Sequence, residues 1–152
     1  ALTANGDTFK CSGRTRQKGL NLTINVKASY DTEWGDGRNV KTLIISEGTK
    51  TDTAKTIIER TGGKDIKTGK QGEDNTTIYT DPTGAEIRHI NEKFGTSLLD
   101  VKAAVLDLDW EPNEGLEDGA PVAGLFYFEI GTDREQALVT KLSCTWQQTK
   151  KK

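Results

Sequence analysis

The alternation of apolar and polar positions along the chain predicts a protein built mainly of β-strands. Between residues 20 and 28, an apolar residue occupies every second position. Since residues two apart point to the same side of a strand, one face of this segment is expected to be buried and the other solvated, as in an antiparallel sheet. Residues 40–46 (VKTLIIS) predict the next strand.

Two cysteines near opposite ends of the chain fall on the apolar phase of their own strands. Cys11 shares its phase with Phe9, and Cys144 shares its phase with Trp146. Both sulfurs are therefore expected to face a core, and they can form a disulfide if the first and last strands are neighbours. The basic connection 14–19 joins the first strand to the second, which indicates a hairpin.

One short helix is expected within residues 49–63. Ala54, Ile57 and Ile58 follow the i, i+3, i+4 spacing of a helical stripe, and a glycine pair that can end the helix follows them. We expect this helix to pack across an open end or face of the sheet. The polar, glycine-containing residues 64–75 predict an exposed loop.

Residues 76–90 predict a hairpin, because the tetrad 81–84 (DPTG) suits a type I turn. A second interpretation stays open at this point. Ile87, Ile90 and Phe94 also fit one stripe of a helix.

The last third of the chain is the richest in apolar residues. Residues 98–110 carry apolar positions in both phases, which indicates either a bulge near Val105 and Leu106 or burial on both faces. Residues 122–130 are apolar in both phases for most of their length, so this strand is expected at the centre of the sheet. Residues 137–147 predict the closing strand.

These segments give about eight strands, one short helix and no internal repeat. The pattern is typical of an antiparallel β-sandwich or flattened β-barrel. We expect a single β-rich domain over residues 1–152, with 149–152 as a frayed tail.

Composition excludes some classes of partner. The chain carries 21 Lys and Arg residues against 23 Asp and Glu, a net charge of -2, so its overall charge gives no reason to expect nucleic acid or an anionic membrane. No run approaches the roughly 20 apolar residues that a membrane-spanning helix needs.

The start of the chain and its cysteine pair suggest export. The sequence contains no methionine, and Ala1 is the kind of small residue that signal-peptide cleavage leaves behind. A disulfide between Cys11 and Cys144 would persist in an oxidising compartment. We therefore predict a secreted or periplasmic protein. A trimmed terminus and two buried free thiols in a cytosolic protein are the alternatives.

An acidic segment offers the one candidate for a metal site. Asp107, Asp109 and Glu111 fall on one face if the strand continues, and three more carboxylates follow by residue 118. Calcium prefers six to eight oxygen ligands, several of them charged. However, Pro112 occupies the position at which an EF-hand loop needs glycine. A solvated acidic edge that discourages strand pairing is the competing interpretation.

Catalytic motifs are absent from the sequence. His89 is the single histidine and has no nucleophile motif near it, and no phosphate-loop, dinucleotide or zinc motif occurs. A hydrolase would have to use acids of the 107–118 segment, such as the pair that flanks Trp110. We therefore expect a protein that is not an enzyme and that needs no cofactor, with calcium as the only candidate ion.

Surface recognition is the function that remains. A basic cluster on the first hairpin comprises Lys10, Arg14, Arg16 and Lys18. Trp34 lies in a glycine-rich turn where it can serve as an exposed anchor. A solvated hairpin tip and a tryptophan folded back onto the core are the alternatives. We predict an exported, non-enzymatic binding module that recognises a protein or glycan through the Trp34 loop and the 64–75 loop. The rival predictions are the hydrolase and a structural or assembly subunit.

Overall fold

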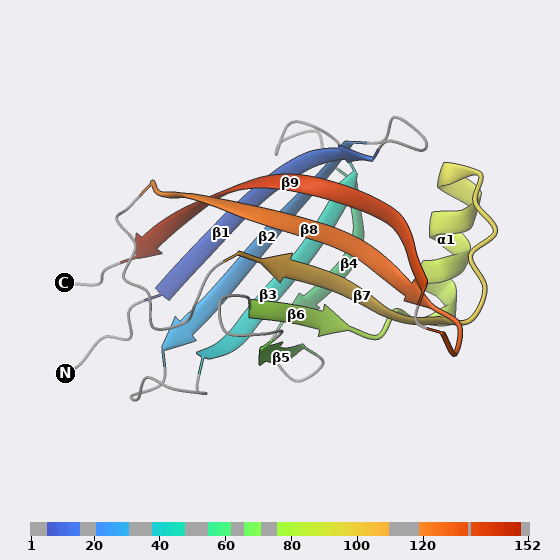
Figure 1. Cartoon of the computed structure of the whole chain (residues 1–152), viewed down its shortest axis with the longest axis horizontal. Coiled ribbons are helices and arrows are strands. Elements are labelled where there is room, and N and C mark those ends of the chain that lie inside the picture. The colour runs from blue at the N-terminus through green and yellow to red at the C-terminus, as the bar shows by residue number, and fades with distance from the viewer. Residues whose placement is uncertain are drawn as a thin grey trace.

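The computed structural model of the chain describes residues 6–15, 21–30, 38–47, 55–61, 66–70, 76–109, 119–133 and 135–149. Within these ranges the chain forms nine β-strands and one α-helix (Figure 1). The elements are β1 (Gly6–Thr15), β2 (Asn21–Tyr30), β3 (Arg38–Glu47), β4 (Lys55–Thr61), β5 (Lys67–Lys70), β6 (Thr76–Thr80), α1 (Gly84–Phe94), β7 (Val101–Leu108), β8 (Pro121–Ile130) and β9 (Glu135–Thr149).

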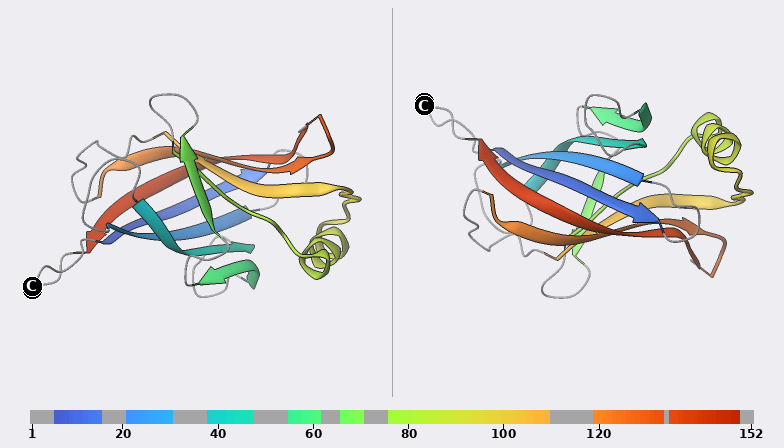
Figure 2. Two further views of the ribbon diagram at one scale, coloured as in Figure 1. Left: turned by 90° about the horizontal axis from the view of Figure 1, so that it is seen from below. Right: turned by 90° about the horizontal axis from the view of Figure 1, so that it is seen from above.

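The strands form one antiparallel sheet in the order β4-β3-β2-β1-β9-β8-β7-β6-β5. Every neighbour in space is a neighbour in the chain, except that the first strand pairs with the last. Because strands twist, so long a sheet curls, and β5 at one edge comes into contact with β3 near the other. Figure 2 shows the curled sheet from two sides, with α1 at one end. Among the described residues no ladder joins β4 to β5, so the sheet is left open along a seam.

This architecture confirms the predicted mainly β, antiparallel, sandwich-like fold with one short helix. The predicted hairpin of the first two strands is also confirmed, because β1 and β2 pair antiparallel. The described strands number nine rather than about eight. Strands β4 and β5 are additional, because they lie in segments expected to be a helix and a loop, whereas the second strand of the hairpin expected over residues 76–90 is replaced by α1.

The main core lies inside the curl of the sheet. Its largest fully buried side chains include Phe9, Phe126 and Phe128, and the rings of the last two meet edge to face at 5.2 Å. Strands β7 and β8 are buried on both faces, because Val105 and Tyr127 belong to a second apolar cluster on the outer side. The predicted burial on both faces is therefore right, and the register shift in β7 lies between Val101 and Ala103 instead of at 105–106.

A disulfide links Cys11 of β1 to Cys144 of β9. The two residues are directly opposite in the β1–β9 ladder, with their Cα atoms 3.9 Å apart, and their positions in the sequence differ by 133. This pairing confirms that both sulfurs face the core and that the first and last strands are neighbours.

The helix expected within residues 49–63 is wrong, because β4 occupies Lys55–Thr61. The β3–β4 register shifts between Ile45 and Ser46, so Ile57 and Ile58 are both buried although they are adjacent in the chain. This bulge produces the apolar spacing that resembles a helix. The β-branched residues of the segment favour a strand.

The hairpin expected over residues 76–90 is also wrong, and the alternative helix is right. Thr83 caps α1: its hydroxyl accepts from the Glu86 amide while the Glu86 carboxylate accepts from the Thr83 amide, which is a capping box. Gly95, at φ 62°, ends the helix in the left-handed conformation. The segment 64–75, expected to be a loop, contains buried Ile66 and the short strand β5.

Candidate functional site

The outer face of the sheet carries a row of side chains that crosses five neighbouring strands. The ladders place Arg14 of β1 opposite Lys141 of β9, and Lys141 opposite Leu125 of β8. Leu125 lies opposite Asp107 of β7, which lies opposite Thr77 of β6. This row, called the outer row below, is about 19 Å long at about 4.8 Å per strand. It brings together basic, apolar and acidic side chains from distant parts of the chain.

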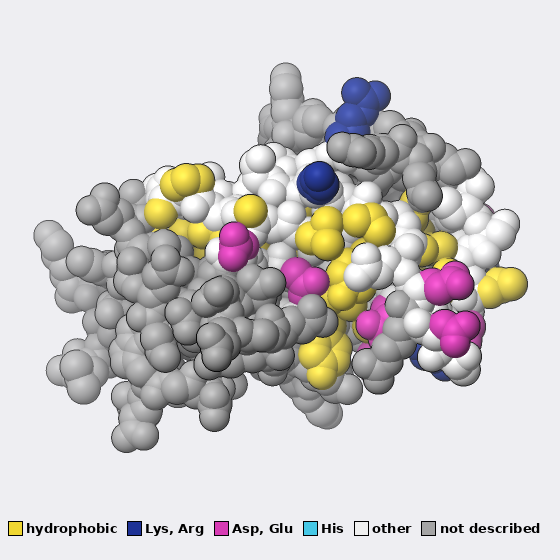
Figure 3. All heavy atoms as spheres, viewed as in Figure 1, with side chains coloured by type: hydrophobic (Ala, Val, Ile, Leu, Met, Phe, Trp, Pro, Cys, Tyr) yellow, Lys and Arg dark blue, Asp and Glu magenta, His cyan; other side chains and the backbone are white. Residues whose placement is uncertain are grey.

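An apolar cluster adjoins the outer row. Val105 lies between Tyr79 and Tyr127 in the β6–β7–β8 ladders, and Leu125 packs against this group. Val105 and Tyr127 are each 3% exposed, whereas Tyr79 and Leu125 are half-buried at the rim. Figure 3 shows hydrophobic side chains at the surface over β8, a basic side chain over β9 and an acidic one over β7.

The acidic end of the outer row holds one of the three predicted metal ligands, and a second lies two residues further along the chain. Asp107 is half-buried and accepts a hydrogen bond of 2.7 Å from the Thr77 hydroxyl, and Asp109 lies exposed on the same face. Glu111 lies outside the described residues. The part of the chain that the structure describes contains no group of three His, Cys, Asp or Glu side chains placed to hold an ion. The calcium site stays a prediction.

The basic end of the row contains one residue that the sequence singles out and one that it does not. Arg14 is exposed on β1, whereas Arg16, Lys18 and Trp34 lie outside the described residues. Lys141 is exposed directly opposite Arg14. No local pattern marks Lys141, because its importance comes only from the pairing of the first strand with the last.

The Cys11–Cys144 disulfide lies on the opposite side of these two strands, three residues from each member of the Arg14–Lys141 pair. Like charges directly opposite each other in a sheet repel. The covalent link between β1 and β9 fixes the two strands that carry this basic pair.

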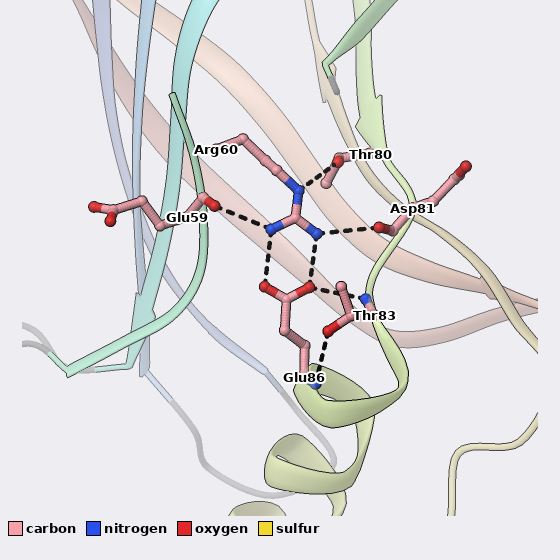
Figure 4. Close-up of polar contacts among 6 residues, drawn as sticks. All are labelled: Glu59, Arg60, Thr80, Asp81, Thr83 and Glu86. Carbon is pink, nitrogen blue, oxygen red and sulfur yellow. Dashed lines mark hydrogen bonds and ion pairs between the residues drawn. The ribbon is translucent and has the colours of Figure 1, made fainter. Parts of the chain in front are cut away.

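A second polar cluster surrounds Arg60 at the end of β4 (Figure 4). Its guanidinium makes a bidentate pair with Glu86, with Nη1 donating to Oε2 at 2.8 Å and Nη2 donating to Oε1 at 2.6 Å. Nε donates to the hydroxyl of Thr80, and the two remaining N–H groups donate to the carbonyls of Glu59 and Asp81. All five donors of the arginine are satisfied.

This Arg60 cluster joins the edge strand β4 to the end of β6 and to α1, across the seam where the described parts of β4 and β5 form no ladder. Burial acts to raise the pKa of Glu86, but the hydrogen bonds from Arg60 and Thr83 and the charge of Arg60 outweigh it. The pKa of Glu86 is therefore lowered from its ordinary value of 4.5. A second ion pair, Lys93 to Glu47 at 2.8 Å, links the last turn of α1 to β3. With every donor used internally, the Arg60 cluster holds the fold together and offers no open position for a ligand.

Two other side chains, His89 and Trp146, form part of neither the outer row nor the Arg60 cluster. His89 is exposed on α1. Trp146 is 3% exposed, and among the described side chains its indole N–H has no hydrogen-bond partner.

Comparison with known proteins gives no assignment. No family model matches the chain, and neither a curated protein nor a solved structure matches it significantly. Within the described residues, the structure contains no helix long and apolar enough to cross a membrane.

Proposed function

We propose that the chain is a secreted or periplasmic, non-enzymatic binding module that recognises a protein or glycan partner. The observation that carries this proposal is the outer row, which sets a basic pair, a half-buried apolar rim and a carboxylate side by side on a broad sheet face. Binding surfaces combine apolar contact area with polar groups that fix orientation. The loops around Trp34 and residues 64–75 are a further candidate surface at the sequence level.

The disulfide supports the same proposal. It fixes the two strands that carry Arg14 and Lys141, so the backbone positions of the basic pair are set before any partner arrives. A preorganised surface loses less conformational entropy on binding than a mobile one. An oxidised pair in the core also suits the exported location, because such a bond persists outside the cytosol.

A capture experiment tests the proposal. Oxidised protein is immobilised and exposed to the extracellular or periplasmic fraction of its source, and bound molecules are identified by mass spectrometry. We expect a defined partner that is lost with Leu125→Ser, with Trp34→Ala or with both. Arg88→Gln on exposed α1 is the control and should keep the partner. If the wild type and the three variants capture the same molecules to the same extent, the proposal is contradicted.

Two further measurements separate the rival functions. A hydrolase that uses the acidic segment would lose turnover with Asp109→Asn, whereas a binding module has no turnover to lose. An assembly subunit would form defined oligomers in size-exclusion chromatography with light scattering. A binding module is expected to stay monomeric.

A further inference from the structure

We propose that the outer face of β1, β9 and β8 binds an acidic polypeptide segment, with its carboxylates over Arg14 and Lys141 and its apolar side chains over Leu125. This inference rests on the proposed binding function and names the chemistry of the partner. It follows from the charges, the register and the exposure of the described residues.

The charge argument begins with the basic pair. Arg14 and Lys141 are directly opposite and both exposed, and Lys10 lies exposed on the same face of β1. Side chains opposite each other in a sheet are about 5 Å apart at Cβ. One carboxylate placed over Arg14 and Lys141 would therefore be attracted by both positive charges.

The spacing along β1 suits an extended polypeptide. Lys10 and Arg14 are four residues apart on one strand, which corresponds to about 13 Å. An extended segment repeats its own side chains at the same interval, so acidic residues four apart would reach both positions. Between them, Ser12 and Ser143 are exposed and opposite each other, where they can pair with polar groups of the partner.

The apolar neighbours favour a polypeptide over a sugar or a base. Lys141 adjoins Leu125, and the exposed side chain of Ala123 lies two residues along β8 on the same face. Bases are held by stacking on open aromatic rings. In the adjoining apolar cluster, Tyr127 is only 3% exposed and Tyr79 is half-buried. Aliphatic side chains of a polypeptide fit this surface better.

The acidic end of the outer row determines where on the sheet face the acidic segment can lie. Asp107 lies on the far side of Leu125 from Lys141, and Asp109 follows it on the same face of β7. An acidic segment placed over β7 would meet these carboxylates and be repelled. The face therefore accepts negative charge over β1 and β9 and rejects it over β7.

The test uses fluorescence anisotropy at low ionic strength with a labelled synthetic peptide of Glu, Leu and Ser. Matched peptides carry Lys or Gln in place of Glu. We expect the Glu peptide to bind more tightly than either matched peptide, and added salt to weaken it. The double variant Arg14→Thr with Lys141→Thr should bind it about tenfold more weakly.

Two variants complete the design. Asp107→Asn should bind the Glu peptide more tightly than the wild type, because it removes a repelling charge. Arg88→Gln removes a positive charge from α1 and should leave the affinity unchanged. Circular dichroism and melting curves confirm that each variant is folded.

Three results would overturn the inference: equal binding of the Glu, Gln and Lys peptides, no loss in the double variant, or binding of a sulfated oligosaccharide in preference to the Glu peptide. The proposed binding function is tested separately, by the capture experiment and by the turnover and oligomer measurements. A partner that is captured through Trp34 while the Glu peptide does not bind would remove this inference alone.

Discussion

At Gly124 the core has no room for a methyl group. A Cβ at this position would lie 2.9 Å from Sγ of Cys144 and 3.4 Å from Cβ of Leu142. The glycine therefore provides the space that the disulfide occupies beside β8.

Gly124→Ala is expected to destabilise the oxidised protein by about 1–3 kcal/mol, the usual cost of overpacking a core. Urea denaturation measures the change. In a Cys11→Ala, Cys144→Ala background the cost should shrink, because the crowded sulfur is gone. Gly84→Ala is the matched control, since a Cβ there meets nothing within 4 Å. Equal costs in the two backgrounds would show that the disulfide is not what fills the space.

Glu86 is the residue through which pH should act on stability. Its folded pKa is lower than its ordinary value of 4.5, so the carboxylate stabilises the fold above that value, and the contribution is lost as pH falls through the folded pKa. Glu86→Gln should cost about 1–2 kcal/mol at neutral pH, because a charge-assisted bidentate pair is lost.

Denaturation measured from pH 7 down to pH 3 checks this expectation. The wild type should lose the advantage over Glu86→Gln as the pH falls below 4.5. Glu92→Gln, an exposed change on the same helix, should follow the wild type. A constant difference between wild type and Glu86→Gln across this range would contradict the assignment.

Several residue environments could be predicted from the sequence. The alternation around Phe9 and Cys11, and around Cys144 and Trp146, correctly placed all four side chains in the core. Lys141 could not be placed beside Arg14 in the same way. Hairpin signals define adjacent strands, whereas the pairing of β1 with β9 is a long-range contact that local pattern does not specify.

At the scale of the element, α1 shows how one signal can favour two structures. Asp81-Pro82-Thr83-Gly84 suits a turn, but Thr83 and Glu86 also form the Thr-x-x-Glu pattern of a capping box. The capping box and the apolar stripe of Ile87 and Ile90 together favour a helix over a turn. On β4 the sequence pattern predicts a helix where the structure has a strand. The bulge opposite Ile45 and Ser46 places two successive isoleucines in the core, which gives the spacing of a helix.

Thr83→Ala should weaken α1 by about 1 kcal/mol through loss of the N-cap. Amide hydrogen exchange resolved along the chain measures the effect. Exchange in residues 84–94 should accelerate, while β8 and β9 in the centre of the sheet should keep the wild-type rate. Thr83→Ser retains the capping hydroxyl and should behave as the wild type. Unchanged exchange in α1 with Thr83→Ala would mean that the cap does not hold the helix.

At the scale of the whole molecule, the strands follow chain order around the curl from β1 to β9, and the disulfide joins the two ends of this path. The open seam lies on the opposite side, between β4 and β5. There the Arg60 cluster links β4 to β6 and α1 with side-chain hydrogen bonds in place of a ladder. The sequence predicts the fold class. It does not predict the position of the seam, because that position depends on which two edge strands form no ladder.

Removal of the disulfide is expected to lower stability by about 4–5 kcal/mol in the chain-entropy account, because the bond closes so long a loop. The Cys11→Ala, Cys144→Ala variant and the oxidised wild type are compared by urea denaturation. Alkylation of unfolded, unreduced protein should modify neither cysteine. Two added alkyl groups would show that the thiols are free and would remove the basis of this expectation.

The measurement that tests the central claim most directly is a chemical-shift map of isotope-labelled, oxidised protein titrated with the Glu peptide. The account predicts that the largest changes lie along the outer row, at Arg14, Lys141 and Leu125, with small changes on α1 and β4. Changes confined to α1, to β4 or to the segments between the described strands would contradict the outer row as the binding surface.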